Sequence, residues 1–359
     1  MKTVSSVDPQ TARRARGIGI RAVAKKAGVS TATVSRFLNR PESVSAELGS
    51  RIRTIIDEVG YIPDASARAL SSRRTRTIGA IIPTIDNAMF AQGLQALQRY
   101  LASQNYLLLL ATNEYDLDVE LAQARNLVSR GIDGLLLRGD AHHDALRDLL
   151  RSQEIDFVNV GVYSPDKPYP SIGVDNAAAG RCIARHLIDL GHRSIGVVAA
   201  MQRNNDRAQA RLRGVTSAIA EAGLTLEPDW FVQVNYKLDE ARQAGRAILK
   251  RANRPTAIVC GNDVIAYGVM LEAQKLGFDV PRDLSVVGFD DLEWSRHLQP
   301  SLTTIHMPTD EIWTRAGEYL VNKLEGHPAM MHREIDFSLV VRESSGPPPS
   351  TTARKKAAE

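Results

Sequence analysis

A short stretch near the N-terminus, residues 31–39, carries side chains whose types could read the edges of DNA bases. With helical spacing its apolar stripe is Val34, Phe37 and Leu38, which leaves a small polar face opposite. That face comprises Thr31, Ala32, Ser35, Arg36 and Asn39. An arginine can donate to a guanine edge or to a phosphate, and hydroxyl groups can reach either. The pattern therefore suits a helix that enters the major groove.

The elements that would position this face are two short helices joined by a glycine turn. Apolar residues recur at helical spacing over residues 20–27, Gly28 permits the tight turn, and Ser30 can cap the next helix. A third helix is expected between Ser45 and Gly60. Together they predict a helix-turn-helix. The alternative is an ordinary small three-helix domain, because glycine-turned helix pairs are common.

The distribution of charge agrees with a polyanionic partner at this end of the chain. The 359 residues have a formal net charge of +4. Residues 1–77 hold 15 Lys and Arg against 6 Asp and Glu, whereas the remainder holds 30 against 35. A basic head on an acidic body indicates that one end meets a polyanion. The alternative is a solvated charged face.

Composition predicts a soluble protein of a reducing compartment. Cys182 and Cys260 lie far apart and outside any C-x-x-C spacing, so neither a disulfide scaffold nor a zinc site is expected. The longest apolar runs are shorter than the about 20 residues that a membrane span needs. Residues 1–16 lack the apolar segment of a secretory signal. We therefore expect a cytoplasmic, nucleoid-associated protein.

The sequence shows no arrangement that indicates catalysis. It contains no G-x-S-x-G, Walker A, G-x-G-x-x-G or H-E-x-x-H motif. His142-His143-Asp144 could bind a metal, but it begins a helical stretch, and a solvated first turn is the preferred interpretation. His192 is interpreted as structural. We expect no enzyme activity, no cofactor and no metal.

The next 260 or so residues change character, because short apolar runs alternate with amphipathic helical stretches. The strand-like runs are 78–82, 107–111, 134–137, 157–160, 194–199, 256–260 and 284–289. The helical stretches are 88–104, 118–130, 177–190, 211–222, 238–251 and 264–276. This alternation predicts parallel sheets with crossover helices, and roughly eleven strands are too many for one typical sheet. The fold class is thus α/β, with an all-α head and two doubly wound lobes.

These patterns divide the chain into five segments. The expected order is a disordered extension (1–16), a helix-turn-helix domain (17–63), a connector (64–76), a two-lobed body (77–343) and a disordered tail (344–359). The connector is small, polar and rich in Ala, Ser and Arg, so it cannot form a hydrophobic core of its own. The tail carries no apolar heptads, so it predicts no coiled coil.

Residues 23–39, VAKKAGVSTATVSRFLN, resemble the head of the LacI/GalR family of bacterial transcription regulators. The likeness continues through Val44-Ser45 and the run from Gly60 to Pro63. It adds Thr33 to the expected DNA-binding residues. This sequence has Gly19 and Ala22 where many members have a capping Thr and an Asp, so the first helix is expected to be less well capped.

The connector resembles the family's hinge helix. The resemblance implies that Leu70 wedges into the minor groove, that the small Ala67 lets two hinge helices approach closely, and that Arg68 lies near phosphates. A wedge between base steps kinks the duplex, and so short a helix would fold only with DNA and a partner helix. The alternative for Leu70 is a plain linker residue.

The body resembles periplasmic sugar-binding proteins, two α/β lobes with an effector in the cleft. The resemblance, with a physical case for each side chain, gives these effector-binding candidates: Phe90, Arg207, Arg211, Tyr236, Asn262, Asp263 and Asp290. Aromatic rings could stack on a ligand, while arginines and oxygen acceptors could bind hydroxyl groups. Arg211 and Asp290 are expected to act as a pair, which suits a polyhydroxy ligand. Phe90 could instead belong to the core, and Asp263 could instead cap the following helix.

The resemblance and the residues together predict a ligand-controlled repressor. We expect a homodimer that binds a pseudo-palindromic operator in double-stranded DNA, and a small polar effector such as a sugar or sugar acid. One rival is a small-molecule receptor without sequence-specific DNA readout. A second is an enzyme with a nucleotide-like α/β fold, although phosphate-binding glycines are missing.

Overall fold

The computed structural model describes residues 19–62 and 74–349. The chain divides into two compact units between Thr75 and Arg76, which are described separately here as the head and the body. None of the helices within the described ranges is long and apolar enough to span a membrane.

The head is a bundle of three helices around a small apolar core. Its elements are α1 (Ile20–Ala27), α2 (Thr31–Asn39), the 3-10 turn η2 (Pro41–Ser43) and α3 (Ala46–Val59). The core comprises Val23, Ala24, Ala27, Val34, Phe37, Ile52 and Ile55. It draws on every one of the three α-helices, so the bundle buries one stripe of each.

Local chemistry sets the ends of these helices. The Ser30 side chain accepts from the backbone N of Thr33, and Ser45 does the same for Leu48. Gly28 follows α1 with a φ of 64°, in the left-handed region that favours glycine. Gly19 precedes α1 without a side-chain cap, as its missing hydroxyl predicts.

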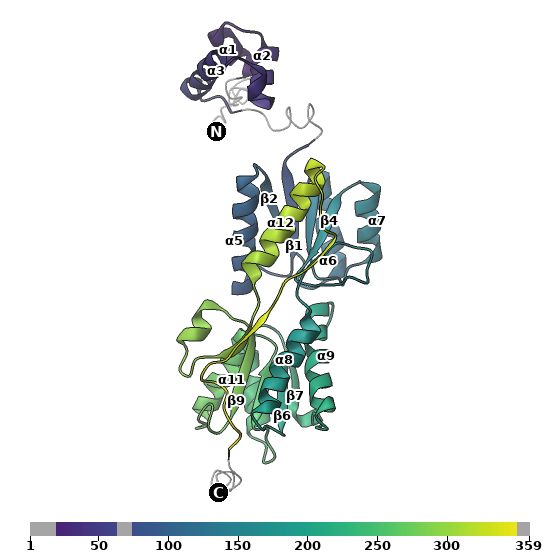
Figure 1. The fold of residues 1–359 in the computed structure, drawn as a ribbon, viewed down its shortest axis with the longest axis vertical. Helices are drawn as coiled ribbons and strands as arrows, with labels where there is room; N and C mark the ends of the chain where they lie inside the picture. Colours follow the sequence, from purple (N-terminus) through teal and green to yellow (C-terminus); the bar gives the residue numbers. More distant parts are fainter. Residues whose placement is uncertain (1–18, 63–73, 350–359) are drawn as a thin grey trace, which may run out of the picture. The chain divides into compact units, whose positions relative to one another are not determined.

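The first lobe of the body, which carries the labels α5, α12 and β1 in Figure 1, is a six-stranded parallel sheet. Its strand order is β11-β5-β4-β3-β1-β2. Its elements are β1 (Thr77–Ile82), α5 (Ala88–Ser103), β2 (Leu107–Thr112), α6 (Leu117–Ser129), β3 (Gly134–Arg138), α7 (Asp144–Ser152), β4 (Asp156–Val160), β5 (Ser171–Gly173), α12 (Thr309–Glu325) and β11 (His332–Glu334). Helices cover both faces of the sheet, so β1 is buried along its whole length.

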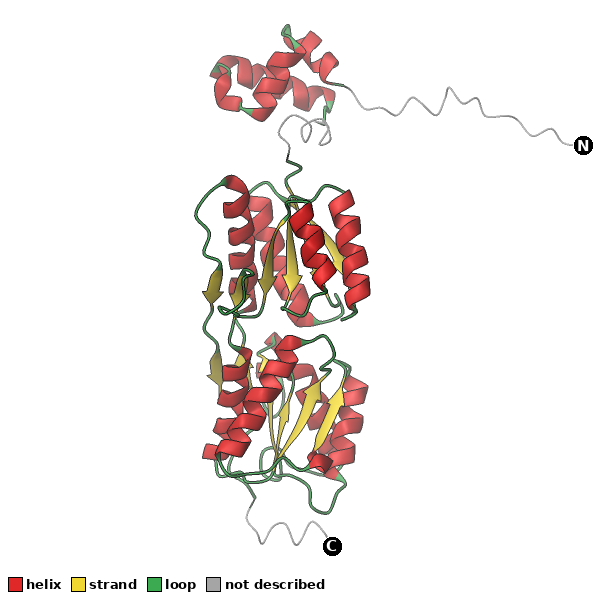
Figure 2. Cartoon of the chain, turned by 90° about the vertical axis from the view of Figure 1, so that its right-hand side faces the viewer, coloured by secondary structure: helices red, strands yellow, loops and turns green. Residues whose placement is uncertain are grey.

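The second lobe repeats this plan, in the order β12-β10-β9-β8-β6-β7, with β12 antiparallel to β10. Its elements are α8 (Asn176–Asp189), β6 (Ile195–Ala200), α9 (Asp206–Glu221), η3 (Pro228–Trp230), β7 (Phe231–Val234), α10 (Leu238–Leu249), β8 (Ala257–Cys260), α11 (Asp263–Lys275), β9 (Ser285–Asp290), η4 (Glu293–His297), β10 (Thr303–His306) and β12 (Ser338–Val340). Figure 2 shows the strands of both lobes as central layers between helices.

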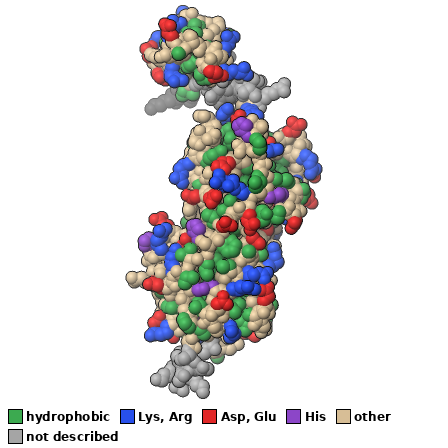
Figure 3. Space-filling model, in the orientation of Figure 1, with side chains coloured by type: hydrophobic (Ala, Val, Ile, Leu, Met, Phe, Trp, Pro, Cys, Tyr) green, Lys and Arg blue, Asp and Glu red, His purple; other side chains and the backbone are tan. Residues whose placement is uncertain are grey.

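The chain passes between the lobes three times, after β5, after β10 and between β11 and β12. In both sheets the order reverses beside the first strand, at β1/β3 and at β6/β8. Ligands of open α/β sheets bind outside the carboxyl ends of the strands at such a switch point. On the face of the body shown in Figure 3, charged side chains of both signs are interspersed.

The expected fold class is confirmed, and each of the seven listed runs is a strand whose ends differ by at most one residue. The sequence analysis missed the short strands β5, β7, β10, β11 and β12, because three or four residues carry too little pattern. Helix α9 begins at Asp206 rather than at residue 211, because the Asn205 side chain caps it by accepting from Ala208.

Both expected boundaries of the body need correction. The backbone N of Arg76, placed in the connector, donates to Asp133 Oδ2 at 2.7 Å within the body. At the other end, Ser344 is buried, and its hydroxyl donates to the Val286 carbonyl at 2.6 Å. The Gly346 carbonyl lies 2.9 Å from the His192 ring. The chain is therefore packed against the second lobe beyond residue 343, where a disordered tail was expected.

Candidate functional site

The head presents its polar α2 face in part to solvent. Thr31, Ala32 and Arg36 are exposed, whereas Thr33 and Ser35 are half-buried. The apolar stripe on the opposite side holds α2 against the other two helices. A lone exposed guanidinium among small side chains can approach a base edge or a phosphate without steric hindrance.

One of these residues has a local role in the head. The Thr33 hydroxyl lies 2.9 Å from the Ser30 hydroxyl, beside the backbone cap, so it completes the start of α2. Asn39 ends the helix, but its side chain is outside the described part of the chain, and so are the hinge candidates Ala67, Arg68 and Leu70.

In the body, side chains at the carboxyl ends of the strands surround a small space. Its lining residues are Met89, Phe90, Tyr115, Arg138, Asn205, Arg207, Ala208, Arg211, Tyr236 and Asp290. They come from both lobes, so the space is an interlobe cleft. Five of the seven sequence candidates line it, and Phe90 also belongs to the apolar core.

Arg211 and Asp290 form the best-connected pair in the cleft. Arg211 Nη1 lies 3.5 Å from Asp290 Oδ1 and donates to the Gly261 carbonyl at 3.3 Å, while Nε donates to Asn176 Oδ1 at 3.0 Å. The guanidinium also lies 4.9 Å from the centre of the Phe289 ring. Burial raises the pKa of Asp290, and Arg211 opposes that rise. Four neighbours therefore fix this arginine in place.

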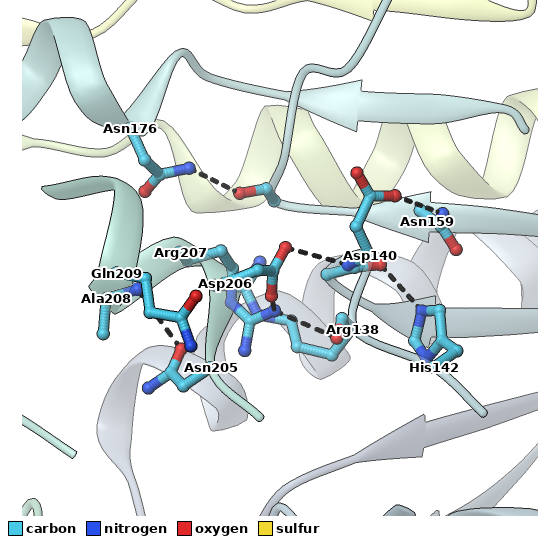
Figure 4. Close-up of polar contacts among 12 residues, drawn as sticks. Arg138, Asp140, His142, Asn159, Asn176, Asn205, Asp206, Arg207, Ala208 and Gln209 are labelled. Atoms are coloured by element: carbon cyan, nitrogen blue, oxygen red, sulfur yellow. Dashed lines mark hydrogen bonds and ion pairs between the residues drawn. The ribbon is translucent and has the colours of Figure 1, made fainter. Parts of the chain in front are cut away.

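Arg207 and Asp206 connect the lobes directly (Figure 4). Arg207 Nη1 donates to Asp206 Oδ1 at 2.7 Å and to the Arg138 carbonyl, in the first lobe, at 3.0 Å. The backbone N of Asp140 donates to Asp206 Oδ2 at 2.9 Å. The start of α9 is thus bound to the turn after β3.

Arg138, at the end of β3, is a cleft residue that the sequence reasoning missed. Its Nη1 donates to the Val160 carbonyl at 2.9 Å, and its guanidinium lies 5.6 Å from the centre of the Phe90 ring. Nε is buried without a hydrogen-bond partner. Burial, followed by repulsion from Arg207, lowers the pKa of Arg138 to about 9, so the side chain is still cationic at neutral pH. A single arginine ending an apolar strand run was the signal available.

Two tyrosines form an aromatic wall of the cleft. The rings of Tyr115 and Tyr236 are stacked, with centroids 6.4 Å apart and planes at 24°. Tyr115, also missed from the sequence, has a φ of 62°, which is unusual for an aromatic residue. Asn205 Nδ2 donates to the Tyr236 hydroxyl at 3.0 Å, which fixes that ring at the start of α9. An apolar ring face and a polar rim suit a ligand that has both characters.

Known proteins match both units of the chain. Residues 19–64 match the model for bacterial regulatory proteins of the lacI family, and residues 184–345 match a periplasmic binding protein-like domain. The HTH-type transcriptional repressor PurR of Aliivibrio salmonicida is 33% identical over 328 residues, which cover 90% of this chain and 98% of that protein. The chain belongs to the LacI family. LacI-family proteins are transcription regulators rather than enzymes.

Solved structures of transcription regulators share the architecture over nearly the whole chain. A transcriptional regulator of the family from Silicibacter pomeroyi is 26% identical, with a TM-score of 0.81 over 91% of this chain and 99% of its own. The complex of the regulator CelR with cellobiose is also 26% identical, with a TM-score of 0.68 over 91% of this chain and 100% of its own. Both modules of the family, helix-turn-helix and ligand-binding-type body, are therefore present.

Two candidates taken from the LacI-family resemblance do not line the cleft space. Asn262 is fully buried, and its side chain caps α11 by accepting from Ile265 at 2.9 Å, so the cap is Asn262 rather than Asp263. The Asp263 carboxylate accepts from Leu292 N, Ser295 Oγ and Thr304 Oγ1. Burial raises its pKa to about 7. These contacts turn Asp263 toward the connection between β9 and β10 rather than toward a ligand.

The histidines behind the cleft also differ from the sequence-based interpretation. His142 is buried rather than solvated, because its ring lies 2.9 Å from Glu120 Oε2 and 2.8 Å from the Gly139 carbonyl. His143 caps α7 instead, by accepting from Ala145. Within the described ranges no cluster of three or more His, Cys, Asp or Glu side chains could hold a metal ion. His142 thus supports the turn that carries Arg138.

Proposed function

We propose that this LacI-family protein is a ligand-responsive transcriptional repressor that binds a pseudo-palindromic operator as a homodimer in the cytoplasm. The observation that carries the proposal is the combination, in one chain, of an exposed polar α2 face with an enclosed polar cleft. A relative that is 33% identical over nearly its full length is itself a repressor.

On DNA, each α2 helix would enter the major groove of one half-site. Arg36 would donate to a base edge, with Thr31, Ser35 and Asn39 beside it. Ala67, Arg68 and Leu70 would belong to a hinge that opens the minor groove between the half-sites. Two-fold symmetry of the dimer then requires half-sites related by the same symmetry.

The effector would bind in the interlobe cleft and alter the equilibrium between lobe arrangements. Arg211 and Asp290 offer a donor and an acceptor to the hydroxyl groups of a sugar or sugar acid, and CelR, a relative, was solved with cellobiose. Contacts such as that between Arg207 and the Arg138 carbonyl link the lobes. A ligand that strengthens or replaces these contacts favours one arrangement, and DNA affinity changes with it.

The test is a selection of bound sequences from random double-stranded DNA with the purified full chain. Enrichment of a pseudo-palindrome supports the repressor. If no sequence is enriched, with or without a metabolite pool, the protein is a small-molecule receptor with an electrostatic anchor. The enriched sequence becomes the probe for the point variant that follows.

Arg36→Ala then tests direct readout. A base contact of this kind contributes about 1–3 kcal/mol of discrimination, so specific binding is expected to weaken while non-specific binding changes little. Arg51→Ala is the matched control, because it removes one exposed positive charge from α3 in the same domain. Equal losses on specific and non-specific DNA would make Arg36 a phosphate contact.

A further inference from the structure

We propose that the effector is a compact polyol bearing an oxyanion, a sugar acid or a sugar phosphate, and that Arg138 is the residue that selects for the negative charge. The inference rests on the proposed function and narrows the chemistry of the same cleft. It follows from how the cleft's charges are paired, because three guanidinium groups line this space.

Two of the three arginines already have a carboxylate. Arg207 is paired with Asp206 at 2.7 Å, and Arg211 is paired with Asp290 at 3.5 Å. Arg138 has no ion-pair partner among the described residues, and its hydrogen bonds go to a backbone carbonyl and, weakly, to the Met89 sulfur. The cleft therefore carries one positive charge in excess, located on the first lobe.

The surroundings of Arg138 make that excess costly. Nε is buried and unpartnered, Phe90 packs at 5.6 Å from the guanidinium, and the cationic Arg207 lies nearby. A buried cation without a counterion is strongly destabilising, and a buried group without a hydrogen-bond partner needs a reason. An oxyanion bound between Arg138 and Arg207 would supply both the missing charge and a hydrogen-bond acceptor.

The rest of the cleft indicates what carries the anion. The lining residues leave little free space between them, so a ligand that the cleft encloses is compact. The stacked Tyr115 and Tyr236 rings offer a flat apolar wall, and Asn205 and Asp290 offer polar groups to hydroxyls. This combination fits a small polyhydroxy acid or its phosphate ester better than a neutral sugar.

The test measures ligand binding by the full chain through its thermal unfolding and by calorimetry. The probes are gluconate, glucuronate, glucose 6-phosphate and inorganic phosphate, with glucose as the neutral match. A ligand that binds the native state raises the Tm. We expect the anions to raise it and glucose to leave it unchanged. Carboxylate and phosphate probes compared side by side identify which oxyanion is preferred.

Three variants separate charge selection from a structural role. Arg138→Met is expected to weaken anion binding at least tenfold, about 1.4 kcal/mol, and to leave the ligand-free Tm unchanged or higher, because it removes an unpaired buried charge. Arg138→Lys keeps the charge and is expected to restore part of the affinity. Arg151→Met is the control, since Arg151 is exposed on α7 and, in the part of the chain that the structure describes, pairs only with Asp148.

The proposal is overturned if wild type and Arg138→Met respond alike to every anion, or if glucose binds as well as the acids. A lower ligand-free Tm in Arg138→Met, without rescue by lysine, would assign Arg138 a structural role instead. Operator binding by the same proteins is measured separately. If the wild-type protein binds no operator, the proposal of a repressor is refuted. If it binds the operator but does not prefer anions, only this inference is refuted.

Discussion

The cleft has two walls, one from each lobe, and they differ in the partners that they give their arginines. The sheets of the two lobes nevertheless have corresponding strand orders. On the second lobe Arg211 has four partners: a carboxylate, an amide, a carbonyl and an aromatic ring. On the first lobe Arg138 has a carbonyl and a ring, but among the described residues no carboxylate pairs with it and its Nε has no hydrogen-bond partner. The second lobe is therefore pre-organised, while the first lobe lacks one anionic partner. A ligand that supplies it would connect the incomplete wall to the complete one.

The largest expected effect comes from removing the carboxylate that pairs with Arg211, so that the second-lobe wall also lacks an anionic partner for its arginine. Asp290→Ala removes the only carboxylate paired with Arg211 among the described residues. Removing one partner of a buried ion pair costs about 3–5 kcal/mol, so we expect a clearly lower Tm of the body and loss of the effector response. DNA binding by the head should persist, which operator titration with and without effector would measure.

Asp290→Asn provides the matched control for that change. It keeps the side-chain shape and an acceptor for Arg211, and asparagine tolerates the positive φ of this residue better than most. Its losses should be intermediate. If Asp290→Ala binds effector as wild type does, the pair does not belong to the ligand site, and the contrast between the walls loses its functional meaning.

A smaller effect is expected from separating the walls without touching any charged side chain. Gly139 has a φ of 84°, and a Cβ there would meet Arg207 Nη1 at 1.6 Å and Asp206 Oδ1 at 2.3 Å. Gly139→Ala must therefore displace the contacts that bind α9 to the first lobe. We expect effector affinity to fall about tenfold or more, with a left-handed strain of about 1–2 kcal/mol added to the folded state.

Gly223→Ala isolates the strain. Gly223 also has a positive φ, 69°, but a Cβ there would meet open space. Calorimetric titration of both variants should show reduced effector affinity in Gly139→Ala alone, while both proteins lose a similar amount of thermal stability. Parallel losses of affinity would mean that backbone strain, and not the interlobe contact, controls binding.

How far the sequence predicted this site depended on the range of the interactions involved. The head was predicted almost completely, because caps such as Ser30 and turns such as Gly28 are local features of the chain. In the body the buried strands were evident from apolar runs. Asp263 also follows a strand, but the hydrogen bonds that turn its carboxylate inward involve residues 292–304, which spacing along the chain cannot reveal.

Arg138 was missed because its surroundings also depend on contacts that are distant along the chain. Its importance lies in what it lacks, a carboxylate, and that can be seen only when both lobes are assembled around it. The starting point of α9 mattered too, because Asp206 and Arg207 meet the turn after β3 only as the first residues of that helix. The candidates Arg207 and Arg211 were thus found, and the expected pair of Arg211 with Asp290 is present, whereas the pair of Arg207 with Asp206 was missed.

The smallest expected effect comes from breaking an exposed ion pair between the two lobes. It tests whether a contact between the walls must be buried to affect effector binding. Lys237 of the second lobe pairs with Asp86 of the first at 2.8 Å, and both side chains are largely exposed. The hydrogen bond to Lys237 lowers the pKa of Asp86, yet water and salt screen such surface pairs. Lys237→Ala should therefore change effector affinity little, and any change should vanish at high salt in calorimetric titrations. A loss as large as that of Gly139→Ala would show that the rim of the cleft, and not its buried arginines, holds the two lobes together.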